Sequence, residues 1–135
     1  MMMNMNKNVS KNDFLEILKC YCDADLVGDV ETRRSTTGFC IILFGAVVHW
    51  SAKLQPTVAL STAEAETIAA TEAVKQIMHL RLFMRELGHE QNCPTVIYED
   101  NAATIAFSEK GEQSKRTKHY QMKVHFISEQ QELGI

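Results

Sequence analysis

The residues best suited to chemistry in this sequence are three acids at the ends of predicted secondary-structure elements. Asp23 ends a short strand, Asp100 follows a second strand directly before a helix, and Glu66 lies near the start of a long helix. Carboxylates that converge from such positions can hold divalent cations, and Mg²⁺ prefers oxygen ligands of this kind. Two cations held together can support phosphodiester hydrolysis.

Taken singly, the two aspartates also have ordinary structural explanations. Asp23, like Asp25 and Asp29 after it, could serve the turn that follows its strand. Asp100 could cap the helix that begins at Asn101. Both alternatives stay open at the level of sequence.

Glu66 is the more informative of the three acids. Ser61 and Glu64 have the S-x-x-E spacing of a capping box, which gives Glu64 a structural role. Glu66 precedes Ala69 and Ala73 at helical spacing, so we expect it near the apolar, core-facing side of the helix. A carboxylate there is costly unless a cation accompanies it, which favours a functional role.

The hydrophobic pattern predicts the strands that position these acids. Residues 18–24 alternate, with Cys20, Cys22 and Ala24 on one face. Residues 38–44 indicate a buried strand, and 47–51 its return after a turn at Gly45-Ala46. Short turns between successive strands predict an antiparallel sheet.

A long helix is expected next, beginning at the capping box and ending at Gly88. Its apolar stripe recurs every three or four residues: Ala69, Ala73, Ile77, Leu80, Met84 and Leu87. Residues 95–98 indicate another strand, and 101–108 and 120–131 indicate helices. This order predicts an α/β (α+β mixed) domain with a mixed sheet flanked by helices.

Length and composition predict a single globular domain. The chain has 135 residues, of which 45% are hydrophobic and 23% charged. We expect a flexible leader at 1–13 and a folded domain at 14–135. No apolar run approaches the roughly 20 residues of a membrane span. Four cysteines lack the spacing of a zinc site, so we expect them to be reduced and the protein to be intracellular.

The net charge of -3 does not by itself favour nucleic acid as a partner. Local clusters matter more than the sum, and two basic clusters are visible. The first is Arg33-Arg34, and the second contains Lys115, Arg116 and Lys118. Solvated loops explain these clusters equally well.

Several segments, in order from residue 20 to residue 127, resemble the ribonuclease H domain of copia-type retrotransposon Pol polyproteins. They include YCDAD at 21–25, RRSTTGF at 33–39, HWSAKLQPTVALS at 49–61, AEAE at 63–66, DN at 100–101, RTKH at 116–119 and HFI at 125–127. The resemblance implies a ribonuclease H-like fold, of which this chain would lack the final strand and helix.

The resemblance also implies a function. It implies an endonuclease that cleaves RNA in RNA–DNA hybrids with Mg²⁺ (or Mn²⁺) held by Asp23, Glu66 and Asp100. Its partner would be the reverse transcriptase portion of the same polyprotein, in the cytoplasm, a retrotransposon particle or the nucleus. Contacts with nucleic acid would come from Arg34, Lys115, Arg116 and Lys118.

The sequence departs from the family's pattern at several positions, which leaves alternative hypotheses open. Leu26 stands where Trp is usual, Thr67 where Tyr is usual, Gln121 replaces an Asp, and Glu99 adds a charge beside Asp100. The family's fourth carboxylate lies on the helix expected to be missing. The alternatives are weak or absent activity, a non-catalytic descendant that binds nucleic acid or protein, and a relic with an exposed sheet edge.

Overall fold

The computed structural model describes residues 18–29, 31–92, 94–101, 104, 127, 129–130 and 132–133. The predicted leader at 1–13, Cys93 and the basic cluster at 115–118 lie outside these residues, as do most residues of the two helices expected after Asp100. Thr104 and Ile127 are described and are helical. In the described part of the chain, no helix has the length and apolar character needed to cross a bilayer.

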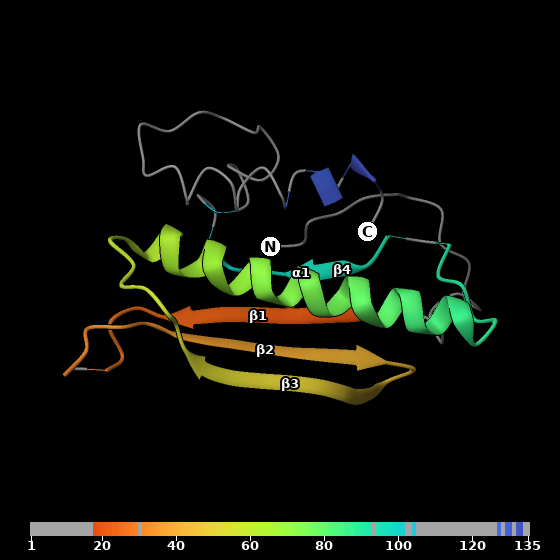
Figure 1. Ribbon diagram of the computed structural model, residues 1–135, viewed down its shortest axis with the longest axis horizontal. Helices are drawn as coiled ribbons and strands as arrows, with labels where there is room; N and C mark the ends of the chain where they lie inside the picture. Colours follow the sequence, from red (N-terminus) through yellow and green to blue (C-terminus); the bar gives the residue numbers. More distant parts are fainter. Residues whose placement is uncertain are drawn as a thin grey trace.

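Four strands form one mixed sheet in the order β3-β2-β1-β4 (Figure 1). They are β1 (Lys19–Asp25), β2 (Thr36–Leu43), β3 (Ala46–Leu54) and β4 (Val96–Tyr98). The pairs β1–β2 and β2–β3 are antiparallel, whereas β4 runs parallel to β1. The prediction of a mixed α/β sheet is confirmed, although β3 extends three residues beyond the predicted return strand.

Helix α1 (Thr62–Glu86) packs on one face of the sheet, against β1 and β2 (Figure 1). Ser61 is its N-cap, and its side chain accepts a hydrogen bond from the Glu64 N–H at 3.2 Å. The Glu64 carboxylate accepts from the Leu60 N–H at 2.9 Å, so the return bond of the capping box reaches one residue before the cap. Gly88 ends the helix with a φ of +81°, as expected of a residue in the left-handed region.

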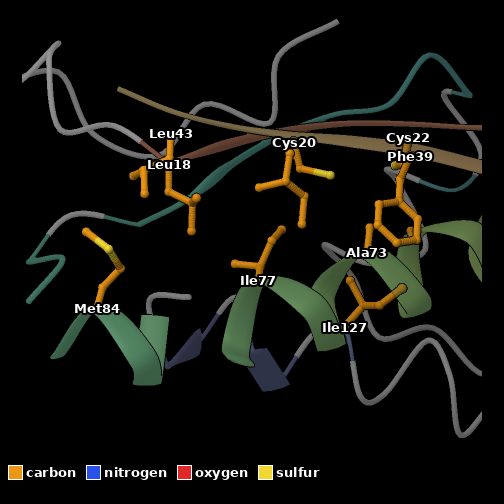
Figure 2. Packing of buried hydrophobic residues seen from close by; sticks show 11 residues of the cluster. Leu18, Cys20, Cys22, Phe39, Leu43, Ala73, Ile77, Met84 and Ile127 are labelled. Carbon is orange, nitrogen blue, oxygen red and sulfur yellow. The ribbon is translucent and has the colours of Figure 1, made fainter. Parts of the chain in front are cut away.

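Two apolar clusters lie between α1 and the sheet. The first, here called the main core, combines large and small side chains, and Figure 2 shows Ala73, Ile77 and Met84 of α1 directed toward the strands. The second, here called the alanine cluster, lies at the N-terminal end of α1 and consists of Ala24, Ala59, Ala65, Ile68 and Ala69, with Leu26 packed against it. One member of the predicted apolar stripe is wrong, because Leu87 follows the helix and is 58% exposed.

The two faces of β1 differ as the sequence predicted. Cys20, Cys22 and Ala24 are buried under α1, whereas Tyr21 is on the other face. Cys20, Cys22 and Cys40 are free cysteines, and burial raises the pKa of the Cys20 thiol to about 12. The prediction of cysteines buried inside the fold is confirmed for the first two, while Cys40 is half-buried.

Candidate metal centre

The parallel pairing of β1 and β4 sets the positions of the two aspartates. Tyr21 is opposite Tyr98 in the register, and the two rings stack with centroids 4.5 Å apart and planes 10° apart. Asp23 and Asp100 each come two residues after these tyrosines, at the same end of neighbouring strands. The register therefore brings the two carboxylates together at the C-terminal ends of β1 and β4.

The third acid reaches the same point from α1, across a contact made by small side chains. Ala65 and Ala69 are fully buried in the alanine cluster beside Ala24 of β1. Small residues at a helix–strand contact allow the two backbones to approach closely. The Thr67 hydroxyl is also buried, and it donates to the Ala63 carbonyl within α1 at 2.7 Å. Glu66 directly follows Ala65 in the sequence, so this close contact carries it to the strand ends.

Asp23, Glu66 and Asp100 converge, and each offers an oxygen atom within 4.8 Å of those of the other two. Asp23 and Asp100 are exposed, while Glu66 is 3% exposed. The Ala24 N–H donates to Asp23 Oδ1 at 2.9 Å, which fixes one oxygen of that group. One edge of the cluster is therefore open to solvent and the other is buried.

The surroundings of Glu66 disfavour a negative charge on its carboxylate. Burial, then the carboxylates of Glu99, Asp23 and Asp100, raises the pKa of Glu66 to about 8. Glu66 Oε2 is buried and accepts no hydrogen bond from the described residues. A buried oxygen without a donor is costly, and a cation among the three carboxylates would satisfy it. The donor set of hard oxygen ligands fits a divalent ion such as Mg²⁺.

Glu99 is a fourth acid at this site, and its burial was not predicted from the sequence. It is 2% exposed, and its Oε2 accepts a hydrogen bond from the Cys22 thiol at 3.3 Å. Its Oε1 accepts from the Asn101 N–H at 3.0 Å. Burial raises the pKa of Glu99 and, with the Glu99 charge beside it, that of the Cys22 thiol. Glu99 is thus held by hydrogen bonds, whereas Glu66 Oε2 has none.

The alternative in which Asp100 caps the next helix is wrong. Asn101 Oδ1 accepts a hydrogen bond from the Thr104 N–H at 3.1 Å, three residues on, as an N-cap residue does. The Asp100 side chain is exposed and belongs to the acidic cluster instead.

The predicted nucleic-acid residues are only partly covered by the described chain. Arg34 is exposed in the loop between β1 and β2, which begins where β1 ends at Asp25. This loop lies at the same end of the sheet as the acidic cluster (Figure 1). Lys115, Arg116 and Lys118 lie outside the described residues.

Comparisons with known proteins give relatives over most of the chain. It is 44% identical over 113 residues to the retrovirus-related Pol polyprotein from transposon TNT 1-94 of Nicotiana tabacum, a match covering 84% of this chain. It is 32% identical over 117 residues to the Pol polyprotein from transposon RE2 of Arabidopsis thaliana, covering 87% of the chain. The chain spans 8% of the length of each of these relatives. No family model matches.

A solved structure shares the fold. It is an RNase H1 isolated from compost by a metagenomic approach, with a TM-score of 0.59 over 85% of this chain and 77% of that one. The sequence identity is 17%, so this likeness establishes the architecture alone. The predicted ribonuclease H-like fold is confirmed.

Proposed function

We propose that this chain, which belongs to the family of copia-type retrotransposon Pol polyproteins and has the ribonuclease H-like fold, is a metal-dependent endonuclease. Its substrate would be the RNA strand of RNA–DNA hybrids. Asp23, Glu66 and Asp100 would hold Mg²⁺ or Mn²⁺. The reverse transcriptase portion of the same polyprotein would supply the hybrid. The domain would then act in the cytoplasm, the retrotransposon particle or the nucleus.

One observation carries this proposal: three carboxylates from β1, α1 and the end of β4 lie with oxygen atoms within 4.8 Å of one another. In the described part of the chain, none of the three forms an ion pair with a lysine or arginine. Like charges this close destabilise one another unless protons or cations neutralise them. Both protons and a divalent cation would neutralise the three carboxylates, but only the cation would also support phosphodiester hydrolysis.

A divalent metal at this position would lower the pKa of a bound water and stabilise charge on a phosphate oxygen. The protein's own contribution is to hold the ligands in place. The exposed Asp23 and Asp100 face the side from which a nucleic acid can approach, and Glu66 forms the buried floor. Rigid strand ends and the packed start of α1 keep these groups preorganised.

Contacts with the substrate would come from basic residues around this end of the sheet. We propose that Arg34 contacts a phosphate, since its loop leaves β1 beside the acidic cluster and its side chain is exposed. Lys115, Arg116 and Lys118 are proposed for the same role. Contacts of this kind read backbone shape and the 2′-hydroxyls of an RNA-containing duplex rather than base sequence.

A hybrid-cleavage assay in Mg²⁺ tests the proposal. The variant Asp23→Asn keeps the size of the side chain but removes its charge, and we expect it to abolish cleavage. Asp25→Asn is the matched control, because Asp25 is also exposed on β1 but lies outside the cluster. Equal cleavage by the two variants, or none by the unaltered protein at any concentration, would refute the catalytic assignment.

The same assay separates the alternative, a descendant that binds nucleic acid without cleaving it. That alternative predicts hybrid binding that weakens with salt, survives Asp23→Asn and occurs without Mg²⁺ binding. The convergent carboxylates favour the enzyme.

A further inference from the structure

Gln55 is a buried polar residue that the proposed chemistry does not use. It follows β3 directly and is 1% exposed, among the most buried side chains of the described chain. A glutamine so placed loses its hydration, and only its amide nitrogen regains hydrogen bonds, since Oε1 accepts none from the described residues. Where these bonds go indicates what the residue does.

One bond donated by the Gln55 amide reaches α1, which carries Glu66, and the other reaches β2, the strand paired with the Asp23 strand β1. Nε2 donates to Thr37 Oγ1 on β2 at 3.0 Å and to the Ala65 carbonyl on α1 at 2.9 Å. Thr37 is paired with Ala24 in the sheet, the residue after Asp23. Ala65 is the residue before Glu66. On α1 the bridge therefore ends at the residue next to Glu66. On β2 it ends at Thr37, whose partner on β1 is the residue next to Asp23.

The bridge is anchored at its base as well. The Gln55 backbone N–H donates to the Ser35 carbonyl at 2.8 Å, so the residue is fixed beside β2 before its side chain extends to the helix. Ser35 is itself fully buried, and its hydroxyl accepts from the Val27 N–H at 3.3 Å. A side chain anchored in this way has little freedom to follow a helix that moves.

Apolar packing at this end of α1 is made mostly by small side chains. Apart from Ile68 and Leu26, the alanine cluster consists of alanines, which bury little apolar surface and have no directional preference. A pair of hydrogen bonds, in contrast, weakens steeply as distance and angle change. The amide therefore adds a directional restraint on the position of α1 to the packing of the alanine cluster.

We propose that Gln55 is a positioning residue for the metal centre, which fixes α1 against the β1–β2 pair so that Glu66 meets Asp23 and Asp100. This inference rests on the proposed metal-dependent function and extends it to a residue that touches neither metal nor substrate. Groups that orient metal ligands from behind typically contribute about 10–100-fold to metal affinity or activity.

The test compares Mg²⁺ binding by calorimetry in the unaltered full chain and in Gln55→Met, which keeps the side chain's length but removes its donors. We expect Gln55→Met to bind Mg²⁺ at least about tenfold more weakly, with cleavage recovering as Mg²⁺ is raised. Thr71→Val is the matched control, since its buried hydroxyl donates to the Thr67 carbonyl within α1 at 2.7 Å. This control should lose stability without losing Mg²⁺ affinity.

The outcomes distinguish the two proposals. Equal Mg²⁺ affinity in Gln55→Met and the unaltered chain overturns the role of Gln55 and leaves the metal centre intact. An unaltered chain that binds no Mg²⁺ overturns the proposed function and this inference together. If Gln55→Met does not fold, as judged by circular dichroism, Thr37→Val replaces it, because it removes one of the two bonds and keeps the other. A weaker Mg²⁺ affinity in Thr37→Val then supports the role, and an unchanged affinity contradicts it.

Discussion

The two ends of α1 contact the sheet through different kinds of side chain. At its C-terminal half, Ile77 and Met84 pack with Leu18, Ile41 and Leu43 in the main core (Figure 2). At its N-terminal end the contacts are made by alanines, Ile68 and the Gln55 amide, and the helix carries a buried carboxylate. One half of the interface buries large apolar surface, and the other is small and polar.

This difference separates stability from function within one helix. Large aliphatic side chains contribute most of the hydrophobic free energy, about 25 cal/mol per Å² of apolar surface removed from water. Alanines contribute less but allow the close approach that brings Glu66 to Asp23 and Asp100. We therefore expect substitutions at the apolar end to change mainly the stability of the fold, and substitutions at the acidic end to change mainly Mg²⁺ binding.

Glu66→Gln should give the largest effect and should break only the acidic end. We expect the rate of cleavage to fall by more than about a hundredfold, which exceeds the effect of substituting residues that only orient metal ligands. Without metal, stability at pH 9 should rise by roughly 1–3 kcal/mol, because a buried charge among like charges is removed. Hybrid cleavage and urea unfolding in a chelator measure the two effects. Retained activity would contradict the assignment of Glu66 as a ligand.

Ile77→Ala should break only the apolar end. Ile77 is fully buried in the main core, and truncation should cost about 2–5 kcal/mol of unfolding free energy. Leu82→Ala, at a 45% exposed position of the same helix, should cost far less. Urea unfolding measures both. Mg²⁺ affinity measured below the unfolding midpoint should be unchanged, and a large loss would show that the two ends are not separable.

Ala69→Val tests whether the alanine cluster must be small. Ala69 is fully buried there, so added methyl groups should push α1 from β1 and cost about 1–3 kcal/mol. Mg²⁺ affinity should fall with it. His79→Val, at an exposed position of α1, reports the cost of a β-branched residue in the helix alone. Matching losses in the two variants would mean that close packing at Ala69 has no importance.

The pH dependence of stability should show the smallest effect. The pKa of Glu66 is raised to about 8, so the folded chain keeps a proton that the unfolded chain releases near 4.5. The unfolded state then binds fewer protons between these values, and stability falls as pH rises from about 5 to 8. We expect a loss of about 1 kcal/mol or more in a chelator, smaller in Mg²⁺ and smaller in Glu66→Gln. A flat profile in the unaltered chain would contradict the buried, metal-free carboxylate.

Local patterns in the sequence predicted most of the fold. The alternation of β1, the Ser61 cap, the end at Gly88 and the order of elements depend on neighbours a few residues apart, which a sequence displays directly. The same patterns placed Asp23, Glu66 and Asp100 at element ends. Their convergence is a consequence of the parallel β1–β4 pair, which no local pattern in the sequence indicates.

The residues that the sequence did not predict depend on contacts between distant positions. Glu99 is buried and accepts a hydrogen bond from Cys22, 77 residues away, whereas in the sequence it resembled an ordinary charge beside Asp100. Gln55 bridges residues 10 and 18 positions away on two elements and lies in a stretch that reads as a loop. Leu87 fits the helical stripe but follows the helix end. Contacts between residues so far apart in the sequence can be identified only once the packing of the elements is known.

Anomalous scattering from a crystal soaked in Mn²⁺ tests the central claim most directly. The account predicts a manganese peak bounded by the carboxylates of Asp23, Glu66 and Asp100, and loss of that peak in Asp23→Asn but not in Asp25→Asn. A fully soaked crystal without a peak among these three residues, or with manganese bound only elsewhere, would contradict it.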